Sequence, residues 1–66
     1  MKVDRKKLFI AMARAELNRD MLAAKAGMPI PTVCNALHRG SCRPATLGRI
    51  AKALGVDVTE ILADED

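Results

Sequence analysis

The sequence predicts an all-α fold of five short helices in one domain, 1–66, and three observations lead to this prediction. Half of the 66 residues are hydrophobic, mainly Ala, Leu, Ile, Val and Met, and the chain lacks Trp and Tyr. Ala, Leu and Met favour helices, whereas Trp and Tyr favour strands. Apolar residues recur at spacings of three and four, and typical cap and stop residues separate the apolar stretches. A chain of this length buries only about 60% of its unfolded surface, so the helices must share one core.

The first helix is expected over about 4–15, because Asp4 is a suitable N-cap. Three cations, Arg5, Lys6 and Lys7, occupy its first turn, where the helix dipole disfavours positive charge. They indicate either a nearby phosphate or an ordinary exposed turn. The apolar stripe of this helix is predicted to be Leu8, Met12 and Ala15.

The second helix is expected over 19–26, between the N-cap residue Asn18 and a stop at Gly27. The third is expected over about 30–38, with prolines in the first turn, where N–H groups have no helical partner in any case. Since Pro29 has no side-chain acceptor, this helix should begin without its usual cap. The two buried faces are predicted to be Leu22, Ala23 and Ala26, and Val33, Ala36 and Leu37.

A loop over 39–43 leads to a fourth helix over 44–54, which begins with a proline and stops at Gly55. An Asp-x-x-Glu capping pair that starts at Asp57 predicts a short fifth helix over about 58–63. The core residues expected from these two helices are Leu47, Ile50, Ala51, Leu54, Ile61 and Leu62.

Positive charge is concentrated in the larger part of the chain. All eleven Lys and Arg residues lie within 1–52 together with three acidic residues, which gives a net charge of +8. The other five acidic residues lie within 53–66, ending in a short acidic tail at 64–66, and that part carries −5. This asymmetry favours a polyanionic partner with the tail turned away from it, although a surface selected for solubility has the same pattern.

Cys34 and Cys42 are too few to indicate the disulfide framework of a secreted domain, so a reduced, cytoplasmic compartment is expected. The first residues are basic and then apolar, as in a signal peptide. However, the apolar run over 8–13 has six residues and is shorter than a signal sequence needs. No stretch reaches the length of a membrane span, so we expect no membrane association.

The second and third expected helices, joined by a tight turn at Gly27, fit the geometry of a helix-turn-helix. Ala23 is small enough to let the two helices approach closely, and Gly27 adopts a left-handed backbone at low cost. Apolar anchors beneath the second of these helices are Met28, Val33 and Ala36.

Two stretches, Leu22-Ala23-Ala24-Lys25-Ala26-Gly27-Met28 and Ile50-Ala51-Lys52-Ala53-Leu54-Gly55-Val56, resemble the lambda repressor and Cro-type helix-turn-helix family, also called the xenobiotic-response-element family. The intervening Asn35-Ala36-Leu37-His38-Arg39-Gly40 is similar to a subset of that family. The resemblance covers about residues 5–63. It implies a five-helix lambda-repressor-like domain that binds double-stranded DNA, usually in transcriptional control.

The resemblance also implies a DNA-contacting surface. Arg19, at the start of the second helix, would contact phosphate. Pro29, Ile30 and Pro31 stand where the family more often has Ser or Gln, so readout there would be apolar, as with a thymine methyl. Asn35 is the expected base reader, because its amide can pair bidentately with adenine. The exposed face is completed by Thr32, Cys34 and His38, and the phosphates would be flanked by His38, Arg39, Ser41 and Arg43.

Several of these residues have plainer interpretations. Thr32 is also suited to a helix-start hydroxyl, and Asn35 to an ordinary solvated position. Cys34, His38 and Cys42 resemble the beginning of a zinc site, but no fourth ligand is near, so we expect no metal and no cofactor. A disulfide between the two cysteines, acting as a redox switch, is a further alternative. The simplest interpretation has Cys34 packing on DNA and Cys42 as an incidental loop residue.

The leading hypothesis is a sequence-specific, repressor-like regulator that binds double-stranded DNA with strong salt dependence. One module covers a half-site, so a homodimer that reads two half-sites about 34–36 Å apart is expected. Its interface would involve the fifth helix and the acidic tail. The alternative is an antitoxin-like or anti-repressor module that binds a protein partner, which the apolar start at 29–31 favours. Enzymatic activity is not expected, because no catalytic triad, paired buried carboxylates or Gly-rich phosphate loop is present.

Overall fold

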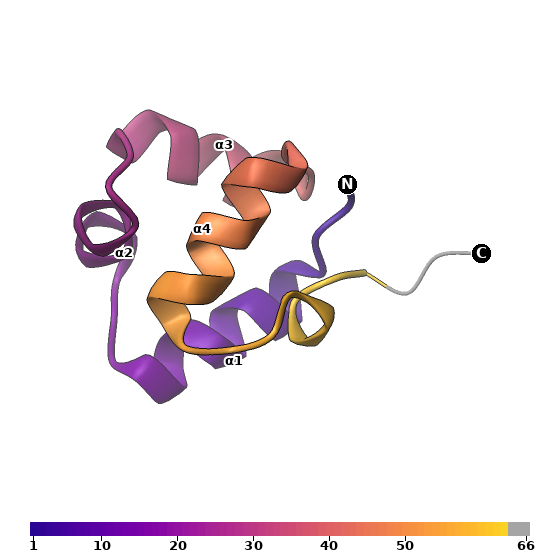
Figure 1. The fold of residues 1–66 in the computed structure, drawn as a ribbon, viewed down its shortest axis with the longest axis horizontal. Coiled ribbons are helices and arrows are strands. Elements are labelled where there is room, and N and C mark those ends of the chain that lie inside the picture. Colours follow the sequence, from indigo (N-terminus) through magenta and orange to yellow (C-terminus); the bar gives the residue numbers. More distant parts are fainter. Residues whose placement is uncertain (64–66) are drawn as a thin grey trace.

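The computed structural model describes residues 1–63, and within that range it is all-helical apart from two isolated β-bridges. α4 crosses the middle of the molecule, and the other helices lie around it (Figure 1). None of the described helices has the length and apolar character needed to cross a membrane. The all-α prediction is confirmed. The elements are α1 (Arg5–Ala15), α2 (Arg19–Ala26), α3 (Ile30–Arg39), α4 (Pro44–Leu54) and the 3₁₀ helix η1 (Val58–Glu60).

The helices begin in two different ways. The Asp4 carboxylate caps α1 by accepting a hydrogen bond from the backbone N–H three residues ahead (3.0 Å), and Asn18 caps α2 in the same way (2.8 Å). α3 and α4 follow Pro29 and Arg43, whose side chains make no capping hydrogen bond. Both predicted caps are therefore confirmed, and so is the uncapped start of α3. The uncapped start of α4 becomes important at the candidate site.

The core forms where α2 packs against both α3 and α4. Ala23 is 1% exposed, which fits its expected role as the small residue that permits close helix approach. Four of the predicted core residues are only partly buried, namely Ala15, Ala26, Leu37 and Leu62. The largest fully buried side chains come from all four α-helices and from the C-terminal segment, and they are Leu8, Leu22, Val33, Leu47, Ile50 and Ile61.

The prediction of a fifth α-helix over 58–63 is wrong. The expected capping pair is present, but the helix ends at Glu60 after a single 3₁₀ turn. The following residues pair instead with the N-terminal segment, where the Asp4 N–H donates to the carbonyl of Ile61 at 3.0 Å. The N–H groups of Ile61 and Leu62 still donate to the carbonyl of Val58, at 3.1 Å each, so the pairing with the N-terminal segment begins at the Ile61 carbonyl. Ile61 is fully buried, as the sequence predicts. The acidic tail at 64–66 lies outside the described residues.

The N-terminal segment also binds the loop that follows α3. The Val3 N–H donates to the carbonyl of Gly40 at 2.7 Å, and the Cys42 N–H donates to the carbonyl of Met1 at 3.0 Å. Residues 1–3 therefore lie between the 40–42 loop and the C-terminal segment, and bridges join them to both sides. This arrangement fixes the loop beside the end of α3.

Truncation of the buried isoleucine tests the importance of the C-terminal segment. Ile61→Ala should lower the free energy of unfolding by about 2–5 kcal/mol, because it leaves a cavity at a fully buried position. The matched control is Ile10→Ala, which removes the same atoms from a side chain that is 45% exposed and should cost about 0.5 kcal/mol or less. Urea denaturation followed by circular dichroism measures both. Equal losses for the two variants would contradict the described packing.

Candidate nucleic-acid interface

The turn between α2 and α3 determines how α3 is placed. Gly27 has a φ of +69°, in the left-handed region that favours glycine. This conformation lets the Met28 N–H donate to the carbonyl of Ala23 at 3.0 Å, which closes the end of α2. Val33 and Ala36 then face the core, at 0% and 1% exposed. The opposite side of α3 faces solvent.

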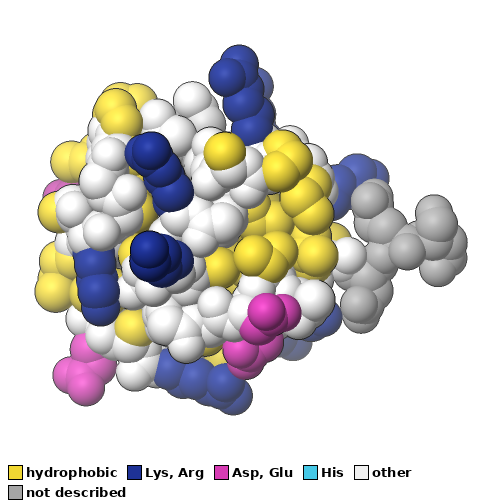
Figure 2. Space-filling model, viewed as in Figure 1, with side chains coloured by type: hydrophobic (Ala, Val, Ile, Leu, Met, Phe, Trp, Pro, Cys, Tyr) yellow, Lys and Arg dark blue, Asp and Glu magenta, His cyan; other side chains and the backbone are white. Residues whose placement is uncertain are grey.

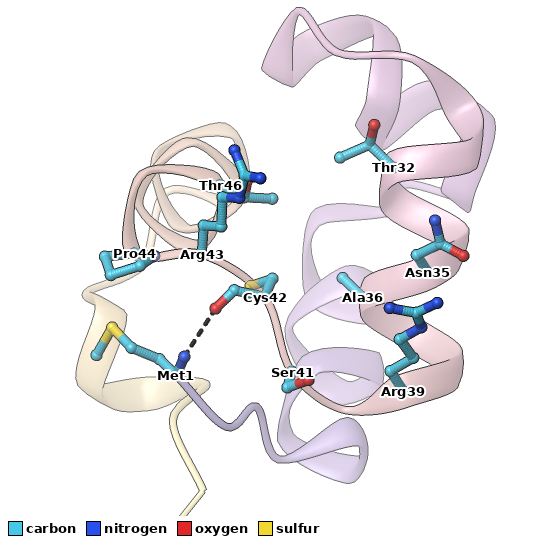
Figure 3. Close-up of a pocket in the computed structure, with 10 residues that line it drawn as sticks. All are labelled: Met1, Thr32, Asn35, Ala36, Arg39, Ser41, Cys42, Arg43, Pro44 and Thr46. Carbon is cyan, nitrogen blue, oxygen red and sulfur yellow. Dashed lines mark hydrogen bonds between the residues drawn. The ribbon is translucent and has the colours of Figure 1, made fainter.

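A groove with a volume of about 700 Å³ runs between α3 and the start of α4. Figure 3 shows Thr32, Asn35 and Arg39 projecting from one side of α3, with Arg43 and Thr46 on the other side of the groove. Ser41, from the loop between the two helices, also lines this groove, as do Met1, Ala36, Cys42 and Pro44. The structure thus brings together five of the predicted site residues: Thr32, Asn35, Arg39, Ser41 and Arg43.

The groove is well suited to an anion. Arg39 and Arg43 supply positive charge, and Thr46 and Ser41 supply hydroxyl groups. The start of α4 borders the groove and lacks a side-chain cap, so the first N–H groups of that helix add their partial positive charge. A phosphate group in this groove would find cations, hydroxyls and backbone donors in one place.

Arg19 lies on the other side of α3. Its Nη1 donates to the sulfur of Cys34 at 3.7 Å, and its Nε lies 3.4 Å from a carboxylate oxygen of Asp20. The Arg19 side chain remains 60% exposed. Together with Arg43, it places a cation on each side of the exposed face of α3. His38 lies on the Arg19 side and lines a different groove from that of Asn35.

The apolar residues at the start of α3 remain at the surface. Pro29, Ile30 and Pro31 are all exposed, with Ile30 at 43%, and they line neither the Asn35 groove nor the groove at His38. Their side chains offer no hydrogen bonds, as the sequence indicates. The polar part of the α3 surface therefore begins at Thr32.

Thr46 and Arg5 were not among the predicted site residues, although both contribute polar groups to these surfaces. Thr46 lines the Asn35 groove. The sequence feature that could have identified it is a hydroxyl residue in the first turn of a helix that has no side-chain cap. Arg5 lies near the end of α3, where its Nη1 donates to the carbonyl of His38 at 3.3 Å. This contact gives a structural reason for one of the cations in the first turn of α1, because a cation is favourable at the C-terminal end of a neighbouring helix.

The three residues considered as zinc ligands have separate surroundings. Within residues 1–63, no three His, Cys, Asp or Glu side chains are close enough together to hold a metal ion. Cys34 contacts Arg19. His38 lines the second groove, together with Phe9 and Arg19, whereas Cys42 lines the groove at Asn35. Both cysteines are free thiols.

Figure 2 shows Lys and Arg side chains standing apart from one another on the face crossed by α4. The groove at Asn35 is distinguished by what accompanies its cations, namely an amide, three hydroxyls and a helix N-terminus.

No family model matches the chain, and no curated protein matches it. Two solved structures are similar to it: a mutant of hydroxyethylphosphonate dioxygenase, with a TM-score of 0.84, and native PhpD with cadmium atoms, with a TM-score of 0.83. Each is 27% identical in sequence, and the match covers 100% of this chain. The chain spans only 14% of the length of each of those proteins. A fold of this kind therefore also occurs as a small part of much longer chains.

Cys42 provides a test of the groove's geometry. Partial burial raises the pKa of its thiol, and this effect exceeds the opposing effect of the positive charge of the N-terminal amino group. In a Cys34→Ser variant, alkylation of Cys42 by iodoacetamide should therefore be slow at neutral pH, because the thiolate is the reactive form. The rate, followed by mass spectrometry, should reach its midpoint at a higher pH than in the same variant unfolded in denaturant. A midpoint at equal or lower pH would show that the thiol is not buried as described.

Proposed function

We propose that this chain is a sequence-specific double-stranded DNA-binding protein, in which α2 and α3 form a helix-turn-helix and α3 enters the major groove. The observation that carries the proposal is the groove in which Asn35 lies together with Arg39, Ser41, Arg43 and Thr46. It combines a side chain able to read a base with groups able to hold a phosphate.

The two sides of α3 support this orientation. The major groove admits one α-helix and has a phosphate backbone along each wall. Arg19 lies on one side of the exposed face of α3, and Arg43 with Thr46 lies on the other. In this arrangement Asn35 meets base edges while cations on both sides meet phosphates. The apolar start of α3, at 29–31, would contact thymine methyl groups.

The resemblance of the sequence to the lambda repressor and Cro-type family supports the same proposal. The left-handed turn at Gly27 and the burial of Ala23, which is 1% exposed, support the proposal, because a helix-turn-helix needs a tight turn and a small residue between its helices. We therefore propose a regulator of transcription, repressor-like, that acts in the cytoplasm as a homodimer on two half-sites. A selection of bound duplexes from a random pool tests this directly, because a symmetric selected sequence would show both the half-site and its repetition.

Loss of the proposed base reader should weaken binding to the selected duplex. Asn35→Ala should lower affinity by about 10- to 100-fold, which corresponds to one bidentate base contact, and should relax selectivity for adenine at one position. Fluorescence anisotropy on the selected and base-substituted duplexes measures both effects. If affinity for the two duplexes falls equally, Asn35 does not read a base.

Loss of a proposed phosphate contact should act differently. Arg43→Ala should weaken binding to all duplexes alike and reduce the slope of log affinity against log salt by about 1. Lys52→Ala removes the same charge from the last turn of α4, far along the helix from the groove, and serves as the matched control. A similar change of slope in both variants would indicate a general charge effect rather than a contact in the groove.

A second candidate function is a protein-interaction module of antitoxin-like or anti-repressor type. The exposed, non-hydrogen-bonding start of α3 supports it, and so does the presence of a similar fold within much longer dioxygenase chains. An anisotropy titration on random duplex at low salt separates the two functions. Non-specific DNA binding under those conditions supports the DNA-binding proposal, and its absence favours the interaction module.

A further inference from the structure

A second groove lies on the other side of α3, between the end of that helix, the start of α2 and the exposed side of α1. Its volume is about 610 Å³, within the range of small-molecule sites. The apolar part of its lining comes from Phe9, Met12 and Leu37. Phe9 is the only Phe, Tyr or Trp in the chain, and it is 54% exposed although it lies next to apolar neighbours.

The polar part of this groove is cationic. Its remaining lining residues are Arg5, Arg19, His38 and Asn18, and within residues 1–63 no acidic side chain lines it. The amide oxygen of Asn18 is already occupied by capping α2. A guanidinium has five N–H donors, so the hydrogen bond from Arg5 to the His38 carbonyl leaves others available. The nearby Asp20 carboxylate is paired with Nε of Arg19, which leaves the terminal nitrogens of that guanidinium facing Cys34 and solvent.

We propose that this groove binds a small molecule with an apolar chain and one carboxylate. The chain would cover Phe9, Met12 and Leu37, and so remove exposed apolar surface from water. The carboxylate would accept charge-assisted hydrogen bonds from Arg5 and Arg19. The volume of the groove, its apolar floor and its positively charged rim together favour this class of ligand over a cation or a neutral polar molecule.

The position of the groove gives the ligand a regulatory role, which rests on the proposed function. Arg19 and His38 belong both to this groove and to the proposed DNA-contacting surface. A carboxylate bound to Arg19 competes with phosphate for the same cation and adds a negative charge beside the DNA backbone. The ligand therefore weakens DNA binding without entering the groove at Asn35.

Sodium decanoate is a suitable probe, and decanol is its neutral counterpart. In a titration followed by ¹H–¹⁵N NMR without DNA, decanoate should shift amide signals of residues 5–12, 18–19 and 37–38, which belong to the elements that line the groove. It should bind at least about tenfold more tightly than decanol, because a hydrogen bond to a charged group contributes that much. Shifts elsewhere, no shifts, or equal binding of the two probes would overturn the proposed site.

Two variants and one control test the two halves of the site. Phe9→Ala should weaken decanoate binding by about tenfold through lost apolar contact, and Arg5→Gln should reduce the preference for decanoate over decanol. Ile10→Ala removes an exposed apolar side chain from the next position of α1, outside this groove, and should leave binding within about twofold. Circular dichroism confirms that each variant folds. Equal effects of Phe9→Ala and Ile10→Ala would overturn the assignment.

A separate measurement tests the proposed regulatory role of the ligand. Decanoate at a concentration that just saturates the parent protein should weaken its binding to the selected duplex by about tenfold, and should weaken it less in Phe9→Ala, whose site it fills only in part. Unchanged DNA affinity at saturation, with decanoate bound, would overturn the regulatory role. If the protein binds no duplex at all, the DNA-binding proposal and the regulatory role both fail, and the NMR titration still decides the ligand site by itself.

Discussion

The left-handed turn at Gly27 is the constraint on which the candidate site depends. Its φ of +69° turns the chain at the end of α2 and brings α3 back across that helix. The approach is close because Ala23, beneath it, has a side chain of one carbon and is 1% exposed. A larger residue at position 23 would hold the helices apart, and a residue with a Cβ at position 27 would be strained whatever space surrounds it. Once this turn is made, the inward and outward sides of α3 are determined.

A second constraint acts at the other end of α3. Residues 1–3 form backbone hydrogen bonds with the loop after α3 and with the C-terminal segment, so three distant parts of the chain meet there. Each such bond contributes about 0.5–1.5 kcal/mol, and together they hold the loop as one wall of the groove at Asn35. The same segment begins α1 at Asp4, which links the loop to the helical core. In a domain with so small a core, backbone pairing of this kind substitutes for further apolar burial.

The surface of α3 is divided in its chemistry. Its start is apolar, its middle carries Asn35, and one side has hydroxyls and two arginines while the other has His38 beside the apolar surface of α1. Both sides are cationic, but the Asn35 side is the more polar of the two. This difference is why the two grooves favour different anions: a phosphate needs many donors, whereas a carboxylate on an apolar chain needs few donors and an apolar floor. Arg19 and His38 are the residues through which the two surfaces would influence each other.

Features that depend on neighbours within one or two helical turns were predicted well. The four α-helices, the caps at Asp4 and Asn18 and the stop at Gly27 follow from side chains that act on backbone groups close by in sequence. Apolar spacing likewise identified Leu22, Val33, Leu47 and Ile50 as core. The last helix was predicted wrongly because its local signals compete with pairing to a remote segment. The capping box formed, but from the Ile61 carbonyl onward the chain pairs with the N-terminal segment.

For the candidate site, the sequence determined the residue types and their order along α3. Helical spacing places Thr32, Asn35 and Arg39 near one another, and this is visible without a structure. Tertiary structure alone determined which residues lie across the groove from these three side chains. Arg43 and Thr46 complete the groove because the loop is held by Met1, whose amino group donates to the carbonyl of Cys42, 41 positions away, at 2.8 Å. It also decided that Phe9 and Arg5 lie beside His38. Contacts between residues so far apart in the sequence depend on how whole helices pack. That packing cannot be predicted from a local pattern of side chains.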